Sequence, residues 1–205
     1  MNKIDFKKEL KDFYQPSKKD FQIVEVPDLK FFKVDGHGDP NSALEYTDAI
    51  EALYAVSYKT KFLSKKKERD YVVPPLEGLW WAEDMETFTN AKDKSQWDWT
   101  MMIMTPDWIT VELMSEALAD VRKKKELPSL EKVRWEIYQE GLAVQILHLG
   151  SYDDEGPILA RLHEKWMPDH GYTFNGLHHE VYLSDPRRVE PQKLKTILRQ
   201  PIRKI

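Results

Sequence analysis

The chain has 205 residues, with 31 lysines and arginines against 35 aspartates and glutamates, and no cysteine. The net charge of -4 and the mixing of acids with bases argue against a nucleic-acid surface, which needs basic patches. The lack of cysteine excludes disulfides, thiol nucleophiles and thiolate metal sites, and fits a reducing compartment. No apolar run approaches the roughly 20 residues that cross a bilayer, and no signal-peptide core opens the chain. We therefore predict a soluble, cytoplasmic protein with no nucleic-acid or membrane partner.

Residues 1–20 and residues 71–96 contain short elements and residues that interrupt a helix or a strand. Residues 1–20 are lysine-rich with apolar residues at helical spacing, which predicts an N-terminal helix and tether. Residues 71–73 indicate a strand that Pro74-Pro75 must interrupt. The polar stretch from Met85 to Gln96 is typical of a turn.

The first half predicts a strand, a long helix and two further strands. Residues 29–35 favour a strand, and residues 42–45 form a capping box before a helix that reaches about Lys61. Residues 79–82 and 97–104 favour the two later strands. The order of elements in this half is therefore βαββ.

The second half repeats this order. Residues 133–139 and 142–149 predict strands, and Glu140-Gly141 between them is typical of a hairpin. The later elements are a helix over residues 158–166 and strands over residues 178–183 and 196–199. The repeat is one of element order, because the two halves share few identical residues.

These elements predict an α+β fold of two βαββ modules. Helices from both modules can cover one face of a shared antiparallel sheet, and the other face, or the join between the modules, is left to hold a ligand. The predicted domain covers residues 21–205 and follows the N-terminal helix and tether of residues 1–20. Its halves are about residues 29–104 and 133–202, with a connecting helix over about residues 110–125.

An acid between aromatic rings stands out near the end of the chain. With the two-residue period of a strand, His178, Glu180 and Tyr182 share one face, and Val181 and Leu183 share the other. Such a carboxylate is costly to desolvate unless a cation or a hydrogen-bond donor meets it, which suits a pocket that binds a ligand. The alternative is an edge strand whose polar face meets water. If Val181 and Leu183 pack under the helices, Glu180 must point towards the join.

The same stretch also contains histidine and glutamate side chains of the kind that bind metal ions. Adjacent histidines on a strand diverge, so only His178 and Glu180 share a face, and a third ligand would have to come from elsewhere. We therefore predict neither a metal nor a cofactor. No glycine-rich phosphate loop and no nucleophile elbow is evident.

Three separated runs resemble one known family. They are PLEGLWW over residues 75–81, EGLAVQILHLGSYD over residues 140–153 and HHEVYLSDPRR over residues 178–188. Together they look like the GyrI-like small-molecule-binding family, and the resemblance covers roughly residues 20–202. It implies two βαββ modules related by a pseudo-twofold axis, with a ligand cleft where the modules join. The family's buried acid, which meets cationic aromatic drugs, corresponds by motif to Glu180, and its aromatic partner corresponds to Trp80.

The resemblance also implies a choice of functions. In transcription-factor members a DNA-binding domain precedes the module, whereas a stand-alone subfamily hydrolyses the cyclopropane of DNA-alkylating natural products of the yatakemycin type. This sequence looks closest to that stand-alone subfamily. We expect binding of flat hydrophobic or cationic xenobiotics in an aromatic cage around Glu180. The alternatives are hydrolysis of such a cyclopropane, which would make the protein a detoxifying enzyme with Glu180 as its catalytic group, and a gyrase-inhibitor-like protein-interaction module.

Further cage members are predicted from facing and ring type. A ring at any of these positions is equally typical of a core, because buried aromatic side chains are ordinary. The candidates are Trp99, Tyr138, Tyr152, Tyr182 and His178. The sequence leaves the oligomeric state open.

Overall fold

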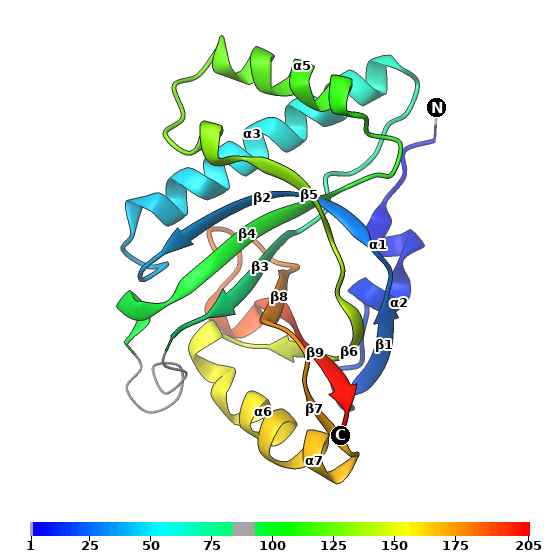
Figure 1. Ribbon diagram of the computed structural model, residues 1–205, viewed down its shortest axis with the longest axis vertical. Coiled ribbons are helices and arrows are strands. Elements are labelled where there is room, and N and C mark those ends of the chain that lie inside the picture. Colours follow the sequence, from blue (N-terminus) through cyan, green and yellow to red (C-terminus); the bar gives the residue numbers. More distant parts are fainter. Residues whose placement is uncertain (1, 84–92) are drawn as a thin grey trace. The chain divides into compact units, whose positions relative to one another are not determined.

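The computed structural model describes residues 2–83 and 93–205 and divides into two compact units (Figure 1). The first unit comprises Met1–Glu9 and Leu29–Tyr138, and the second comprises Leu10–Asp28 and Gln139–Ile205. Most of the turn predicted from Met85 to Gln96 lies outside the described residues, which resume just before a short 3-10 helix, η1 (Lys94–Gln96). In the part of the chain that is described, no helix is both long and apolar enough to cross a membrane.

The first unit is an antiparallel sheet with two long helices. Its strands follow the order β5 (Arg134–Tyr138), β2 (Leu29–His37), β4 (Asp98–Thr105) and β3 (Leu76–Trp81). Helix α3 (Leu44–Lys66) packs against β2 and β4, and α5 (Val111–Arg122) packs against α3, as Figure 1 shows. Every residue of β4 after the first is buried, which explains why its sequence is nearly continuously apolar.

Several expectations for this unit are met, and two are wrong. The long helix is present and runs five residues beyond the predicted Lys61 to Lys66. The capping box is wrong, because Ala43 is the N-cap residue and makes no side-chain cap hydrogen bond. The strand over residues 71–73 is also wrong: Tyr71 forms only an isolated bridge with Ile4. The two prolines that follow lack the N–H groups that a longer ladder needs.

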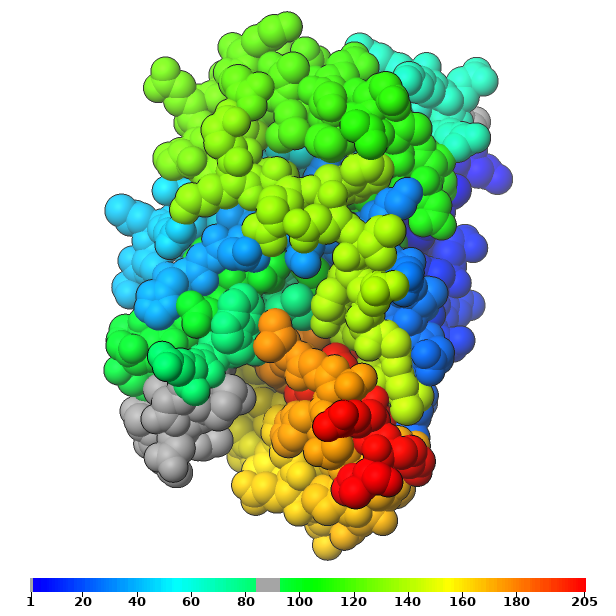
Figure 2. Space-filling model, in the orientation of Figure 1, coloured from blue at the N-terminus to red at the C-terminus, as the bar shows by residue number. Residues whose placement is uncertain are grey.

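The strands of the second unit are also antiparallel. Its strands follow the order β1 (Gln22–Val26), β6 (Gly141–Leu149), β9 (Lys195–Lys204) and β8 (His178–Tyr182), and β7 (Tyr172–Phe174) also pairs with β9. The orange surface of residues 172–182 accordingly adjoins the red surface of β9 in Figure 2. A helical segment runs from α6 (Gly156–Ala160) through a π-helix, η4 (Arg161–Trp166), to α7 (Met167–Asp169).

In each unit a strand is followed by a helical segment and further strands, which are β3 and β4 in the first unit and β7, β8 and β9 in the second. The fold is α+β with antiparallel strands. The hairpin predicted at Glu140-Gly141 is wrong, because β5 pairs with β2 while β6 pairs with β1 and β9. Gly141 instead has a φ of 68°, which suits a glycine at a change of chain direction. Strands β1 and β7 were not predicted; both are short, with five and three residues.

Helical elements pack on both faces of the strands of the second unit. On one face, Val144 and Ile202 pack with Leu162 and Met167 of the α6 to α7 segment. On the other face, Val181 and Ile197 pack with Tyr14 of helix α2 (Lys11–Tyr14), which follows the short helix α1 (Phe6–Glu9). This division decides where each residue of β8 points.

Candidate functional site

Strand β8 places the predicted acid and its ring neighbours on one face. His178, Glu180 and Tyr182 alternate with the buried residues His179 and Val181. The side chains of His178 and Glu180 are 14% and 13% exposed, and Nε2 of His178 lies 3.2 Å from Oε1 of Glu180. The face predicted for Glu180 is therefore neither an open edge nor a dry core.

Glu180 faces the α6 to α7 segment. In the register of β8 with β9, Glu180 lies opposite Leu198 and Tyr182 lies opposite Thr196. Directly opposed residues of an antiparallel pair point to the same side, and this is the side on which Ile202 of β9 packs with the helical segment. Val181 packs against helix α2 and not against the α6 to α7 segment. Glu180, on the opposite face of β8, therefore points towards the α6 to α7 segment.

Glu155 is a functional candidate that the sequence did not reveal. It is the N-cap residue of α6 and only 5% exposed, yet its side chain makes no cap hydrogen bond. Its carboxyl interacts with that of Glu180, while its Oε1 has no hydrogen-bond partner among the described residues. In the sequence it closes an acidic run before Gly156-Pro157, which is an ordinary helix start. Only the packing shows that it turns towards the sheet.

The two carboxyl groups have opposite pKa shifts. Burial raises the pKa of Glu155 well above its ordinary value, and the neighbouring Glu180 carboxylate adds to this. Burial also acts to raise the pKa of Glu180, but hydrogen bonds from His178, Tyr182 and Glu155 outweigh it, and the pKa is lowered. Two adjacent and largely buried acids cannot both ionise without strong repulsion, so these opposite shifts favour a neutral Glu155 beside an ionised Glu180.

Aromatic and imidazole rings surround this pair. Tyr152, in the 3-10 helix η3 (Tyr152–Asp154), meets Tyr182 edge to face with ring centroids 5.7 Å apart. Burial and then the Glu180 charge raise the pKa of Tyr152 to about 12, so its hydroxyl stays a donor at neutral pH. His163 of the π-helix packs on Phe174 at 5.0 Å, and burial followed by the charge of His178 lowers its pKa to about 4. Tyr152 and His163 are therefore neutral groups near this pair at neutral pH.

No strong cation holds this anion in the described part of the chain. The ion pair of Glu180 there is with His178, and no lysine or arginine joins it. Nδ1 of His178 and Nε2 of His163 are buried and have no hydrogen-bond partner among residues 2–83 and 93–205. The same residues contain no group of three or more histidine and acidic side chains that could hold a metal ion. The cluster thus keeps hydrogen-bonding capacity that the described side chains do not use.

The other predicted ring residues belong to the first unit. Trp80 lies near Tyr46 and Trp97, with ring centroids at 6.1 and 5.8 Å. Trp99 is 0% exposed, and a Cβ atom added at Gly36 would lie 2.1 Å from its ring, so Trp99 fills the space left by that glycine. Tyr138 packs edge to face on Phe31 and lies under the ammonium group of Lys33 at 5.6 Å. Ligand contact by Trp80, Trp99 or Tyr138 stays a prediction.

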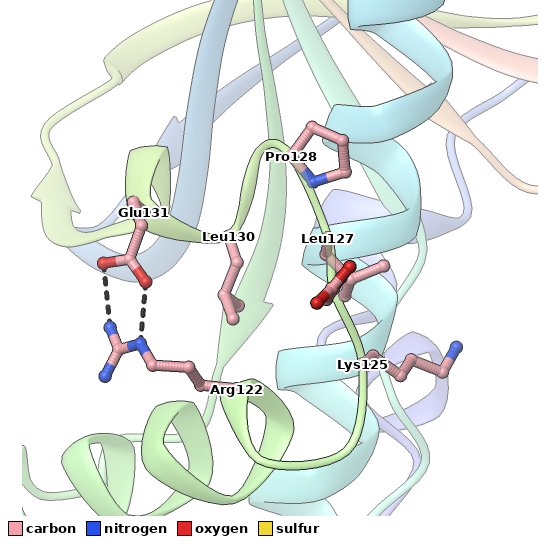
Figure 3. A pocket seen from close by; sticks show the side chains of 7 residues that line it. Arg122, Lys125, Leu127, Pro128, Leu130 and Glu131 are labelled. Atoms are coloured by element: carbon pink, nitrogen blue, oxygen red, sulfur yellow. Dashed lines mark hydrogen bonds and ion pairs between the residues drawn. The ribbon is translucent and has the colours of Figure 1, made fainter.

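Two surface hollows lie elsewhere. The larger, about 450 Å³, is lined by Arg122, Glu131 and the chain between them, with Arg122 and Glu131 joined by a two-pronged ion pair (Figure 3). The second, about 340 Å³, lies in the second unit and is lined by residues that include Phe21, Arg161 and Trp166. Neither lining contains a predicted site residue. Both hollows are open and their ionic groups are exposed, so their chemistry is that of an ordinary polar surface.

Comparisons with known proteins bear on this site. The chain matches the GyrI-like small molecule binding domain over residues 19–203. A solved structure of an uncharacterized conserved protein from Listeria innocua is 39% identical, covers 98% of this chain and 100% of its own, and has a TM-score of 0.89. A hydrolase from Listeria innocua is 38% identical with the same coverage and a TM-score of 0.87. The C-terminal domain of EcmrR, at 13% identity over 91% of this chain and 98% of its own with a TM-score of 0.56, shares the fold. No curated protein matched the chain.

Proposed function

Because the chain belongs to the GyrI-like small-molecule-binding family, we propose that it binds a flat, hydrophobic small molecule beside Glu180 and hydrolyses it. The observation that carries the proposal is the Glu180 carboxylate, which is only 13% exposed and pairs with a histidine instead of a lysine or arginine among the described residues. Because its pKa is lowered, Glu180 is ionised at neutral pH and is available to accept a proton from water. The 38% identical relative that is a hydrolase supports the catalytic form of the proposal.

The proposed substrates are the cyclopropane-bearing DNA alkylators of the yatakemycin type. In the reaction, Glu180 accepts a proton from water while the water oxygen bonds to the cyclopropane methylene carbon. The carbon–carbon bond that breaks sends its electron pair through the conjugated ring to the carbonyl oxygen, which becomes a phenol after protonation. Tyr152 and Tyr182 supply ring surface and hydroxyl donors beside the anion, and so can hold the planar substrate for attack.

The second candidate is capture without turnover. The same anion, flanked by two tyrosine rings, suits a planar cationic xenobiotic, because a cation gains from both the charge and the ring faces. Capture would protect a cell in proportion to the amount of protein, whereas hydrolysis would protect it repeatedly.

Incubation with a cyclopropane-bearing alkylator separates the two candidates. Protein at one hundredth of the alkylator concentration is mixed with it, and the masses of free and bound compound are followed with time. Many equivalents of product heavier by one water per protein support hydrolysis. At most one equivalent of bound, unchanged compound supports capture, and neither hydration nor binding would contradict the proposed function.

A further inference from the structure

We propose that Glu155 and Glu180 hold one proton between them and form an acid and base pair, in which Glu155 gives its proton to the substrate oxygen while Glu180 takes one from water. This inference rests on the proposed hydrolytic function and adds the residue that supplies the proton. Glu155 is not part of the motifs by which the chain resembles its family, which end at Asp153 and resume at His178.

The position of Glu155 is unusual for a glutamate at the start of a helix. The backbone N–H groups of Ile158 and Leu159 donate to its main-chain oxygen at 3.1 and 3.0 Å, so the backbone is fixed as a helix N-terminus. A carboxylate there ordinarily accepts from the first-turn N–H groups and is stabilised as an anion. Glu155 as a residue is 5% exposed and its side chain makes no such bond; its carboxyl interacts instead with Glu180 of β8 and Thr196 of β9. The carboxyl of Glu155 therefore interacts with another acid and does not cap its own helix.

Such a contact is stable only when one partner is neutral. A neutral carboxyl donates a hydrogen bond, and an ionised neighbour accepts it, whereas two anions at this depth repel each other. Among residues 2–83 and 93–205, the cationic group that pairs with Glu180 is His178, so the negative charge is only partly compensated there. The surrounding titratable side chains are His178, His163, Tyr182, Tyr152, Asp153 and Asp185. Burial favours the neutral form of Glu155, which is the more buried of the two by residue exposure.

One oxygen of Glu155 is available to a ligand. Its Oε1 is buried and without a hydrogen-bond partner in the described residues, although a buried carboxyl oxygen ordinarily has one. With a substrate carbonyl beside the pair, the carboxyl of Glu155 can carry its proton on Oε1 and donate it to that carbonyl, in place of donating it to Glu180. An acid whose pKa is raised and whose Oε1 has no partner in the described residues thus lies next to an acid whose pKa is lowered.

The two carboxyl groups account for each proton that moves in the reaction. Water loses a proton to Glu180 and its oxygen bonds to the methylene carbon of the cyclopropane. The broken carbon–carbon bond supplies the electron pair that reaches the carbonyl oxygen, and that oxygen receives the proton of Glu155. Glu155 is then the anion and Glu180 the acid, and transfer of the proton across their hydrogen bond restores the starting state. The net consumption is one water per substrate.

Titration of the two carboxyl groups in the ligand-free protein tests the shared proton. Carbon-13 at the side-chain carboxyl of glutamate is followed by NMR from pH 3 to pH 9, and the two resonances are assigned with the Glu155→Gln and Glu180→Gln variants. We expect both resonances to respond in two separated steps, one below and one well above the ordinary glutamate range. In Glu155→Gln, Glu180 should titrate in a single step. Two independent single steps near the ordinary range in the wild type would overturn the shared proton.

Turnover of the alkylator tests the donor role. Glu155→Gln keeps the shape of the side chain but carries no acidic proton, so kcat should fall by about 100-fold, the low end for general acid catalysis. The loss of rate that accompanies ionisation of Glu155 at high pH should also disappear from the variant. The control is Glu164→Gln, which alters an exposed acid on the same helical segment and should keep the wild-type kcat. A wild-type kcat in Glu155→Gln would overturn the donor role.

The two experiments also distinguish this inference from the proposed function. If the wild type turns over no alkylator, the proposed hydrolysis and the donor role of Glu155 both fail, and the titration still decides whether the pair shares a proton. If the wild type turns over and the carboxyl groups titrate independently, hydrolysis stands and the acid and base pair fails.

Discussion

Two buried glutamates in the second unit have opposite surroundings. Oε1 of Glu140 lies 2.6 Å from Nδ1 of His179, and its Oε2 accepts from Nη1 of Arg199 at 3.0 Å. Arg199 also donates to Gln145 at 2.9 Å and to the main-chain oxygen of Phe13 at 2.6 Å. Glu180 lies beside His178 and Glu155, and no lysine or arginine pairs with it in the described residues.

The comparison separates scaffold from site. Burial alone would raise the pKa of Glu140, but His179 and Arg199 outweigh it and lower the pKa to about 2. A buried charge with all its hydrogen bonds made belongs to the scaffold, whereas one with unused capacity is prepared for another molecule. Adjacent residues of β8 serve the two purposes, because His179 points to the Glu140 network and Glu180 to the opposite face. The two-residue period of the strand keeps these roles apart.

The largest expected effect is on stability, at Glu140. Glu140→Gln leaves the guanidinium of Arg199 buried without its counter-ion, so the free energy of unfolding should fall by about 3 to 5 kcal/mol. Urea unfolding followed by circular dichroism measures this. The matched control is Glu25→Gln, an exposed glutamate of the same unit, which should change stability by less than about 0.5 kcal/mol. Equal stability of Glu140→Gln and the control would contradict the structural role assigned to Glu140.

Acid should remove the same contribution from the wild type. The folded-state pKa of Glu140 is depressed from 4.5 to about 2, so its contribution is present above pH 4.5 and is lost as the pH falls towards 2. The shift corresponds to roughly 3 kcal/mol. Unfolding free energies measured at steps from pH 5 to pH 2 should fall more steeply in the wild type than in Glu140→Gln. Parallel curves would show that Glu140 does not dominate the acid transition.

Glu155 should make the unfolding free energy depend on pH in the opposite direction. Its folded-state pKa is raised, so the stability it contributes is present below the ordinary glutamate pKa and is lost as the pH rises through the raised value. Wild-type stability should therefore decline over that range relative to Glu155→Gln, which has no such proton to lose. Urea midpoints of the two proteins between pH 4 and pH 9 measure the difference. A constant difference would contradict the raised pKa.

The smallest expected effect on stability is at Glu180. Glu180→Gln removes a buried charge that lacks a strong counter-ion, and the amide can still meet His178 and Tyr182. The unfolding free energy should change by less than about 1 kcal/mol, in contrast to Glu140→Gln. A loss as large as that of Glu140→Gln would assign Glu180 to the scaffold.

The sequence predicted the elements whose pattern is local and missed features that depend on packing. The alternation of β8 and the α3 helix follow from periods of two and 3.6 residues, so the face that Glu180 shares with His178 and Tyr182 was predictable. The partners of β5 and β6 were not, because Glu140-Gly141 looks like a hairpin whichever strands its neighbours join.

The candidate site was predictable only in part for the same reason. Glu155 is separated from Glu180 by 25 positions, and an acid before a helix is explained by capping alone. Likewise, nothing in the sequence distinguishes Glu140 from Glu180 as scaffold and site. That distinction arises from which face of the sheet carries Arg199.

The most direct test of the account is the rate of hydration of a cyclopropane-bearing alkylator by wild-type protein and by Glu180→Gln, at equal folded concentration. The account predicts many turnovers by the wild type and a rate at least about 100-fold lower for Glu180→Gln, because the base that activates water is gone. Equal rates in the two proteins would contradict the role assigned to the Glu180 carboxylate.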